Sequence, residues 1–336
     1  MAEKHRIGII GCGGIANAKH MPSLKQIKNV EMVAFCDIIE ERAVKACKEY
    51  GTPDAKAYTD YKELLLDDSI DIVHVCTPNR SHSFITVDAL EAGKHVMCEK
   101  PMAKTYADAV AMLEAAKRTG KKLTIGYQNR QLAENQYAKA VCENGELGEI
   151  YSVEAHMDCG HSAAKRQWLG AFPGGMMFFL GCHLVDMAIL LRGFPEEIVP
   201  YNASTGIGGV TAPDYGFAVL KYPNGVSFVK TCAAEVGGYM RRQLVVTGSK
   251  GSVQLLPFEA MVDYGRTTDI YTGVRECLDT SRSWWNDGFR YTTPAFDRYA
   301  AMMKGFASYV AGEKENPFTP DYELAVYRAI LKACGR

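Results

Sequence analysis

The sequence predicts an α/β protein in which a doubly wound parallel sheet is followed by an α+β domain with a large, mostly antiparallel sheet. Two patterns carry this prediction. Short apolar runs alternate with helical periodicity in the first third of the chain, whereas after residue 126 strand-like runs follow one another with turn signals between them. We therefore expect two domains, at residues 1–125 and 126–336.

The first domain has the pattern of a parallel sheet. Apolar strand-like runs lie at residues 6–10, 31–36, 70–76, 94–98 and 122–125. Helical spacing of apolar residues between them predicts helices at 40–50, 81–92 and 106–119. Strands that are apolar on both faces and separated by helices indicate a parallel sheet covered on both sides, and right-handed crossovers make it doubly wound.

The second domain has the pattern of an antiparallel sheet. After a helix expected at 131–143, strand-like runs lie at 149–157, 198–205, 216–222, 226–233, 243–247 and 252–256. The dipeptide Asn224-Gly225 between two of these runs favours a hairpin, and a closing helix is expected at 322–332. With helices on one face only, the open face of the sheet is expected to join copies of the chain.

The composition excludes several classes of protein. A net charge of -1 without a basic run argues against nucleic-acid binding. The first strand begins at Arg6, which leaves no room for a signal peptide, and no apolar run is long enough for a membrane helix. The 11 cysteines form no Cys-x-x-Cys pair, so we expect reduced thiols and a cytoplasmic protein. We expect no metal site, because His156 and His161 are not joined by further ligands at a known spacing.

A glycine-rich segment directly after the first strand predicts a dinucleotide site. Its residues are Gly11, Cys12, Gly13, Gly14, Ile15 and Ala16. They match G-x-G-x-x-A between a strand and a helix, where Gly11 permits the turn and Gly13 admits a pyrophosphate to the helix N-terminus. The alternative is a purely structural turn.

The next strand ends at Asp37, whose carboxylate can accept the ribose hydroxyls of adenosine and repel a 2′-phosphate. This position favours NAD over NADP. The alternative interpretation of Asp37 is a cap of the following helix.

Two more segments follow strands at the edge where ligands of such sheets bind. The first contains Thr77, Pro78, Asn79 and His82; the second is Glu99-Lys100-Pro101. Each proline ends its strand and fixes the backbone beside the expected cofactor. We assign the non-proline residues of both segments, together with Pro78, to cofactor binding.

These segments together resemble the Gfo/Idh/MocA family of oxidoreductases over nearly the whole chain. The resemblance rests on residues 11–16, 77–82, 98–101, 126–130 and 174–186. It implies an NAD(P)-binding Rossmann domain, a second domain for substrate binding and oligomerisation, and an active site between the two. It also implies a sugar, cyclitol or related polyol as substrate, and a homodimer or homotetramer.

The resemblance assigns Lys100 a place beside the nicotinamide and the reacting hydroxyl, and it implies a cis peptide bond at Lys100–Pro101. In the second domain, the family's Gly-Gly…Asp…His…Asp pattern matches at Gly174-Gly175, His183 and Asp186, but Phe179 stands where the first Asp belongs. That departure puts the family's full catalytic triad in doubt and indicates a Lys–His pair or a different substrate group.

The chemistry of these residue types agrees with such roles. Hydride transfer from a carbinol requires removal of the hydroxyl proton, which the imidazole of His183 can accept near neutral pH. Lys100 can stabilise the developing alkoxide. Asp186, one helical turn after His183, can orient the imidazole or pair elsewhere. Candidate substrate contacts are Tyr127, Asn129, Arg166, Trp168 and His183.

Three functions remain open at this point. The first is an NAD-dependent sugar or polyol dehydrogenase. The second retains NAD and oxidises a sugar transiently, so that a glycosidic bond is cleaved. The third is a ligand sensor without catalysis on the same fold, against which the presence of both Lys100 and His183 counts.

Overall fold

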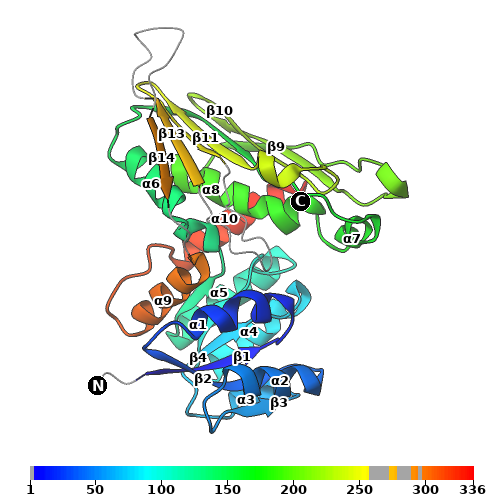
Figure 1. The fold of residues 1–336 in the computed structure, drawn as a ribbon, viewed down its shortest axis with the longest axis vertical. Helices are drawn as coiled ribbons and strands as arrows, with labels where there is room; N and C mark the ends of the chain where they lie inside the picture. The colour runs from blue at the N-terminus through cyan, green and yellow to red at the C-terminus, as the bar shows by residue number, and fades with distance from the viewer. Residues whose placement is uncertain (1–3, 257–271, 278–288, 294–296) are drawn as a thin grey trace. The chain divides into compact units, whose positions relative to one another are not determined.

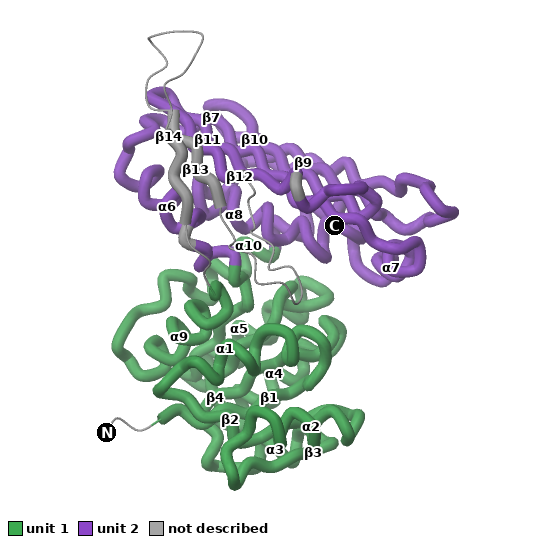
Figure 2. The backbone as a smooth tube through the Cα atoms, in the orientation of Figure 1, with its two compact units in different colours: residues 1–128, 297–327 green, residues 129–296, 328–336 purple. Residues whose placement is uncertain are grey.

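The computed structural model of the chain describes residues 4–256, 272–277, 289–293 and 297–336. The chain divides into two compact units, one of residues 1–128 and 297–327 and one of residues 129–296 and 328–336 (Figure 2). The sequence predicted one crossing, between residues 125 and 126. In the structure the chain also returns to the first unit at residue 297.

The first unit contains a six-stranded parallel sheet of Rossmann type, which confirms the predicted fold class (Figure 1). Its strands are β1 (His5–Ile10), β2 (Val30–Cys36), β3 (Lys56–Tyr58), β4 (Ile72–Val75), β5 (His95–Cys98) and β6 (Leu123–Ile125). The order β3-β2-β1-β4-β5-β6 reverses direction between β1 and β4. In such sheets, ligands bind outside the carboxyl ends of the strands at this reversal.

Both faces of β1 are covered, as its apolar sequence requires. Ile7 and Ile9 are buried in a core cluster that includes Met303 and Phe306 of the late helix α9 (Arg298–Val310). On the other face, a Cβ added at Gly8 would lie 3.0 Å from a methyl group of Leu64. Helix α9 therefore belongs to the core of the first unit, because its apolar face is buried there.

The remaining helices of the first unit lie between its strands. They are α1 (Met21–Leu24), α2 (Glu40–Tyr50), α3 (Tyr61–Leu65), α4 (His82–Glu91) and α5 (Tyr106–Thr119), with short turns η1 (Ala16–His20) and η2 (Asn79–Ser81). Helix α5 begins at a capping box of Thr105 and Asp108 and ends at Gly120, whose φ of +68° is left-handed. The closing helix α10 (Pro320–Ala333) contributes to both units.

The second unit contains an eight-stranded, mostly antiparallel sheet in the order β14-β13-β12-β11-β7-β10-β9-β8. The strands are β7 (Ile150–His156), β8 (Glu197–Pro200), β9 (Tyr215–Tyr222), β10 (Gly225–Cys232), β11 (Gln243–Gly248), β12 (Ser252–Leu256), β13 (Thr272–Cys277) and β14 (Phe289–Thr293). The hairpin predicted at Asn224-Gly225 joins β9 to β10 and is confirmed by their antiparallel pairing. Strands β7 and β10 pair in parallel.

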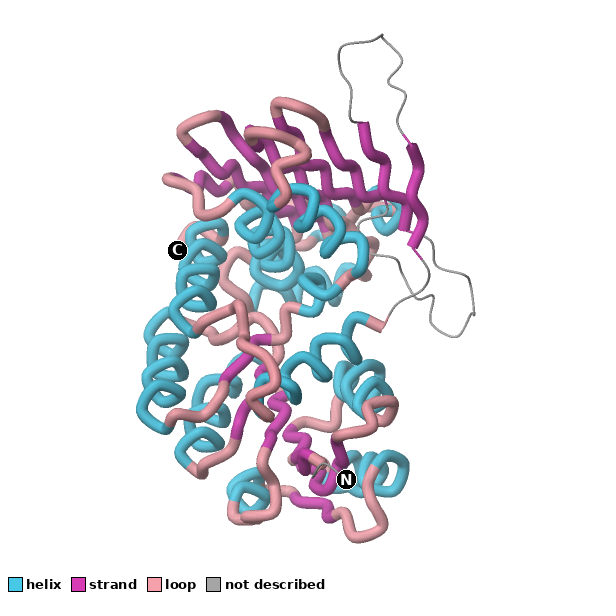
Figure 3. The backbone as a smooth tube through the Cα atoms, turned by 90° about the vertical axis from the view of Figure 1, so that its left-hand side faces the viewer, coloured by secondary structure: helices cyan, strands magenta, loops and turns pink. Residues whose placement is uncertain are grey.

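Helices cover one face of this sheet (Figure 3). The helical segments of the unit are η3 (Gln128–Gln131), α6 (Ala133–Glu143), α7 (Ala163–Trp168), η4 (Leu169–Ala171), η5 (Met177–Gly181), α8 (Cys182–Arg192), η6 (Ile207–Gly209) and η7 (Gly238–Arg241). Helix α8 packs against β7 and β10, and α6 packs against α8 and β12. Among the helices described, none has the length and apolar character needed to span a membrane.

Candidate active site

The glycine loop follows β1 at the carboxyl edge of the parallel sheet. Gly11 has a φ of +95°, and a Cβ there would lie 2.8 Å from the backbone between Cys76 and Thr77. Only glycine fits this position, because both the backbone conformation and the space exclude a side chain. A Cβ at Gly13 or Gly14 would meet nothing within 4 Å. The loop therefore offers open space at the two positions where a pyrophosphate would approach.

The helix after the loop begins with a π-helical turn, η1, which starts at Ala16 and follows Ile15. Asn17 stabilises the turn, since its side-chain amide donates to the carbonyl oxygens of Cys12 at 2.6 Å and Gly13 at 2.9 Å. Backbone N–H groups at the start of such a helix are a general anion-binding feature, and the anion site expected here stays a prediction. Sequence reasoning had not singled out Asn17.

Asp37 connects the end of β2 to the glycine loop. Its Oδ2 accepts the backbone N–H of Cys12 at 2.9 Å, and its Oδ1 accepts that of Ile39 at 2.9 Å. The helix cap expected as the alternative is not formed, because the N-cap of α2 is Ile39. A carboxylate has about four lone-pair sites, so Asp37 retains acceptor capacity for ribose hydroxyls. Burial raises the pKa of the neighbouring Cys12 and Cys36 to about 12, which keeps both thiols protonated.

The loops after β4 and β5 bind each other. The side-chain amide of Asn79 donates to the carbonyl oxygens of Pro101 at 2.6 Å and Ala103 at 3.0 Å. His82 is buried and bridges the same two loops, with Nδ1 3.0 Å from the Pro101 oxygen and Nε2 2.8 Å from the Thr77 oxygen. The Lys100–Pro101 peptide bond is cis, as predicted. Asn79 and His82, expected to contact cofactor, thus hold the loop that carries Lys100.

Glu99 faces the protein interior. Its Oε1 lies 2.7 Å from Nε2 of His20, and its Oε2 accepts the backbone N–H of Lys100 at 3.1 Å. Burial by itself raises the pKa of Glu99, but the hydrogen bond and charge of His20, with the charge of Lys100, outweigh it and leave the pKa below its ordinary value. The expected role of Glu99 in cofactor binding stays a prediction.

In the second unit, Arg130 and Asp186 form an ion pair that joins η3 to α8. Arg130 binds Asp186 with Nη2 2.6 Å from Oδ1 and Nε 3.0 Å from both carboxylate oxygens. Both side chains are buried, at 3% and 0% exposure. Burial raises the pKa of Asp186, and the charge of Arg130 opposes this. Of the two roles left open for Asp186, the structure shows pairing with Arg130.

His183 lies on α8 and is buried, at 3% exposure. It precedes Asp186 by one helical turn, so the two side chains share a face of α8. Asn129 lies beside the ion pair in sequence and is fully buried, and neither side-chain atom of its amide has a hydrogen-bond partner among the described residues. Its backbone oxygen accepts the amide of Asn135 at 2.7 Å. Tyr127, in the first unit, is buried at 2% exposure.

The other two predicted substrate contacts differ in exposure. Arg166 is buried, and its Nη1 lies 2.8 Å from Oδ2 of Asp214, which also accepts the hydroxyl of Thr205. Trp168 is 46% exposed, and its ring packs edge to face against Phe179 at a centroid distance of 5.7 Å. The ammonium of Lys165 lies 3.5 Å from the centroid of the Trp168 ring. Phe179 thus serves an aromatic cluster where the resemblance implied an Asp.

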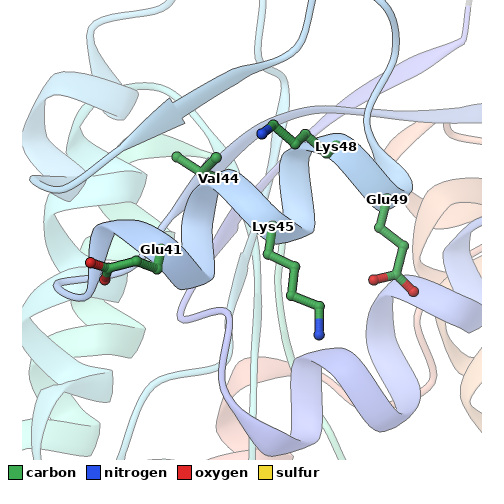
Figure 4. A pocket seen from close by; sticks show the side chains of 5 residues that line it. All are labelled: Glu41, Val44, Lys45, Lys48 and Glu49. Carbon is green, nitrogen blue, oxygen red and sulfur yellow. The ribbon is translucent and has the colours of Figure 1, made fainter.

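A surface depression along α2 does not coincide with these residues. It is lined by Glu41, Val44, Lys45, Lys48 and Glu49, all from one helix (Figure 4). Its charges are mixed, and it contains neither histidine nor cysteine. Within the described ranges, no group of three or more His, Cys, Asp or Glu side chains is arranged to hold a metal ion.

Several contributing residues carried no signal in the sequence. His20, Arg130 and Asp214 bind partners that lie 79, 56 and 48 positions away in the chain. Arg130 was part of a segment that the resemblance had quoted, but its partner was unknown. His20 and Asp214 had no motif, so only the folded chain reveals them.

A parallel sheet in this order, with an open glycine loop at the reversal point, defines a Rossmann-type dinucleotide-binding oxidoreductase fold. Comparison with known proteins makes this specific. The profile described as "Oxidoreductase family, NAD-binding Rossmann fold" matches residues 5–127, and the "GFO/IDH/MocA C-terminal domain" matches residues 135–254. The chain belongs to the Gfo/Idh/MocA family of oxidoreductases.

Individual relatives agree. An uncharacterized oxidoreductase of Schizosaccharomyces pombe is 31% identical over 255 residues, which are 74% of this chain and 69% of that protein. The D-glucoside 3-dehydrogenase of Escherichia coli is 36% identical over 198 residues, 56% of this chain and 54% of that protein. The structure of the aldose-aldose oxidoreductase of Caulobacter crescentus covers 99% of both chains, with a TM-score of 0.84 and 26% identity.

Proposed function

We propose that this chain is an NAD(P)-dependent dehydrogenase that transfers a hydride between nicotinamide and a hydroxyl or keto carbon of a sugar, cyclitol or related polyol. One observation carries the proposal. Lys100 follows β5 at the carboxyl edge of the parallel sheet, and the open glycine loop lies at the same edge. The backbone N–H of Lys100 donates to Glu99, and the carbonyl of the next residue, Pro101, accepts from Asn79. A cation fixed at this edge suits stabilisation of a developing alkoxide.

The residues of the first unit fit a dinucleotide. Gly13 and Gly14 leave the space that a pyrophosphate needs, and the amides that follow them favour its charge. Asp37 retains acceptor capacity for ribose hydroxyls, and its negative charge disfavours a 2′-phosphate. We therefore propose NAD as the cofactor, ahead of NADP. When bound, it supplies the hydride acceptor or donor.

The proton of the reacting hydroxyl requires a separate group. We assign it to His183, whose imidazole can accept and return a proton near neutral pH. Lys100 holds the oxygen and balances its charge as the proton leaves. The ion pair of Arg130 and Asp186 fixes the face of α8 that carries His183.

Substrate hydroxyls need hydrogen-bond partners. We propose Asn129 for this role, because both ends of its buried amide lack a partner among the described residues and a buried amide without partners is costly. Trp168 has the exposure and ring needed to stack on a sugar. Tyr127 and Arg166 remain proposed contacts, although Arg166 already binds Asp214 in the structure.

The test is a kinetic panel. Purified protein is mixed with aldoses, glucosides and cyclitols, NAD or NADP is added, and absorbance of the reduced cofactor is followed. Lys100→Met and His183→Asn should each lower kcat/KM by about 100-fold or more, in the range of lost electrostatic and acid–base catalysis. The matched control Lys104→Met replaces an exposed lysine four positions on and should keep full activity. Equal activity of all variants would refute the proposal.

The same panel separates the two alternatives. Phe179, in place of the family's carboxylate, keeps transient oxidation with glycosidic cleavage in consideration. In that case reduced cofactor forms only up to the enzyme concentration while the sugar chain is cleaved. A sensor would bind sugar saturably without any absorbance change.

We also propose that the chain forms a homo-oligomer through the open face of the eight-stranded sheet. Alternation along β9 and β10 directs Phe217, Val219 and Phe228 away from the covered face. The rings of Phe217 and Phe228 pack at a tilt, with their centroids 5.7 Å apart. Tyr201, which packs on Phe217, is 58% exposed. Light scattering after size exclusion should report a dimer or tetramer, and Phe217→Glu should yield monomer.

A further inference from the structure

Three buried polar side chains contact one another in a row that ends at the backbone of Lys100. None of the three takes part in the proton or hydride transfer proposed above. His20 ends η1, His74 lies on β4, and Glu99 follows β5. Their exposures are 0%, 1% and 5%. His20 occupies the middle, with Nε2 2.7 Å from Oε1 of Glu99 and Nδ1 3.2 Å from Nδ1 of His74. Three elements thus place ionisable groups in contact inside the core of the first unit.

The geometry restricts where the protons lie. Of two Nδ1 atoms 3.2 Å apart, one must carry a hydrogen and the other must accept it. Burial, together with the charge of His20, holds the pKa of His74 well below its ordinary value, so His74 is neutral. His20 either donates to His74 or accepts from it. In both arrangements Nε2 of His20 donates to Glu99, because the low pKa of Glu99 leaves it a carboxylate, which can only accept.

The carboxylate of Glu99 is therefore committed at both oxygens. Oε1 accepts from His20, and Oε2 accepts the backbone N–H of Lys100 at 3.1 Å. On the other side of Lys100, the carbonyl of Pro101 is held by Asn79 and His82. The backbone on both sides of the Lys100 side chain is thus bound to buried polar groups.

We propose that His20 is a positioning residue for Lys100: by donating to Glu99, it keeps that side chain ionised and oriented, and so fixes the backbone from which the Lys100 ammonium extends. This inference rests on the proposed role of Lys100. It explains why Gly126 is glycine, since a Cβ there would lie 3.3 Å from Oε1 of Glu99.

Among the described residues, the Glu99 carboxylate accepts hydrogen bonds from His20 and from the Lys100 backbone. The ring of Tyr299 from α9 tilts against His20 at a centroid distance of 5.8 Å. The titratable groups that face Glu99 are His20, Lys100, His82 and the thiol of Cys76, whose pKa burial raises well above its usual value. Without His20, Oε1 of Glu99 would lose the hydrogen bond that His20 supplies in a buried site, and this loss favours the protonated form of the carboxyl.

The test compares two substitutions of one residue. His20→Gln keeps an N–H donor toward Glu99, whereas His20→Leu removes it. We expect His20→Leu to lower kcat by ~10-fold or more with the dissociation constant of NADH changed by less than ~3-fold, since misplacement of a catalytic group costs mainly kcat. His20→Gln should recover most of kcat.

The pH profile separates positioning from loss of fold. In His20→Leu, the fall of kcat on the acid side of the profile should move to higher pH than in the wild type and in His20→Gln, because Glu99 loses the donor that favours its ionised form. Glu99→Gln should be slow at every pH and lack this shift. His5→Leu is the matched control, because His5 pairs with Asp71 at 2.5 Å at the opposite end of β1. It should keep wild-type kcat and profile.

A readout without turnover keeps the inference testable by itself. In histidine-labelled protein, NMR should show a strongly deshielded Nε2 proton of His20 that persists from pH 6 to pH 8 and is lost in Glu99→Gln. A wild-type profile in His20→Leu, or kcat loss equal in the Gln and Leu variants, overturns the positioning role. Full activity of Lys100→Met would instead refute the proposed function. If His20→Leu fails to fold, the profiles of His20→Gln and Glu99→Gln decide.

Discussion

The ion pair of Arg130 and Asp186 allows a quantitative test of how the second unit holds its site. Three nitrogen–oxygen distances of 2.6, 3.0 and 3.0 Å join the two groups. The side chains are 3% and 0% exposed. At an effective dielectric constant of ~20, charges ~4 Å apart attract by ~4 kcal/mol. Removing one partner of such a buried pair costs about 3–5 kcal/mol, because the other charge stays desolvated.

We therefore expect Asp186→Leu and Arg130→Met each to lower the free energy of unfolding by about 3–5 kcal/mol. The double variant should lose far less than the sum, with a coupling energy of ~2 kcal/mol or more, because no charge remains buried. Urea unfolding of the four proteins, followed by circular dichroism at pH 7.5, measures this cycle.

The exposed pair of Lys221 and Glu197 is the matched control. Its side chains are 49% and 58% exposed, and Lys221→Met should cost at most ~0.5 kcal/mol. Additive losses in the Arg130–Asp186 cycle, or single losses as small as that of the control, would refute the assignment of this pair as the link between residues 129–131 and α8.

Three further predictions concern the first unit. Gly11→Ala should weaken NADH binding in a fluorescence titration by ~10-fold or more, the equivalent of about 1.4 kcal/mol, because the new Cβ would meet backbone at 2.8 Å. The control Gly120→Ala also has a positive φ, of +68°, but its Cβ would meet open space, so NADH binding should be unchanged. Asp37→Ser should shift the ratio of kcat/KM values toward NADP, and an unchanged ratio would exclude Asp37 from cofactor selection. Burial lowers the pKa of His74 and takes that of His95 to about 4, so the unfolded chain binds more protons and stability should fall as pH drops below ~6.5. The Tm measured from pH 8 to pH 5 should show this fall, and His95→Gln should reduce it.

Much of the first unit was predictable because its signals are local. Strands of the sheet are apolar on both faces, and the glycine loop lies where strand, turn and helix adjoin in sequence. The short strand Lys56–Tyr58 and the helix Tyr61–Leu65 escaped prediction because neither has enough apolar residues to show a period. The strand expected at 198–205 ends at Pro200, although Tyr201 and Ala203 beyond it still donate their backbone N–H groups to Phe217 and Tyr215 of β9.

The return of residues 297–327 to the first unit had no local signal. The apolar residues of α9 could pack into either unit as far as the sequence shows. Their contacts with β1 and α1 place them in the core of the first unit. The same holds for Phe179. Its sequence position indicated a missing carboxylate, whereas the structure shows a ring packed on Trp168.

The sequence by itself determined the fold class, the glycine loop and the residue types available for catalysis, because each depends on neighbours within a few positions. The cis bond at Lys100–Pro101 was expected from the family resemblance. The tertiary structure alone decided the partners of the buried charges, joining His20 to Glu99 and Arg130 to Asp186. Sequence alone does not say which opposite charge folding will bring close to a charged side chain. Once the side chain is buried it requires that partner, because an unpaired ion in the core lowers the stability of the fold.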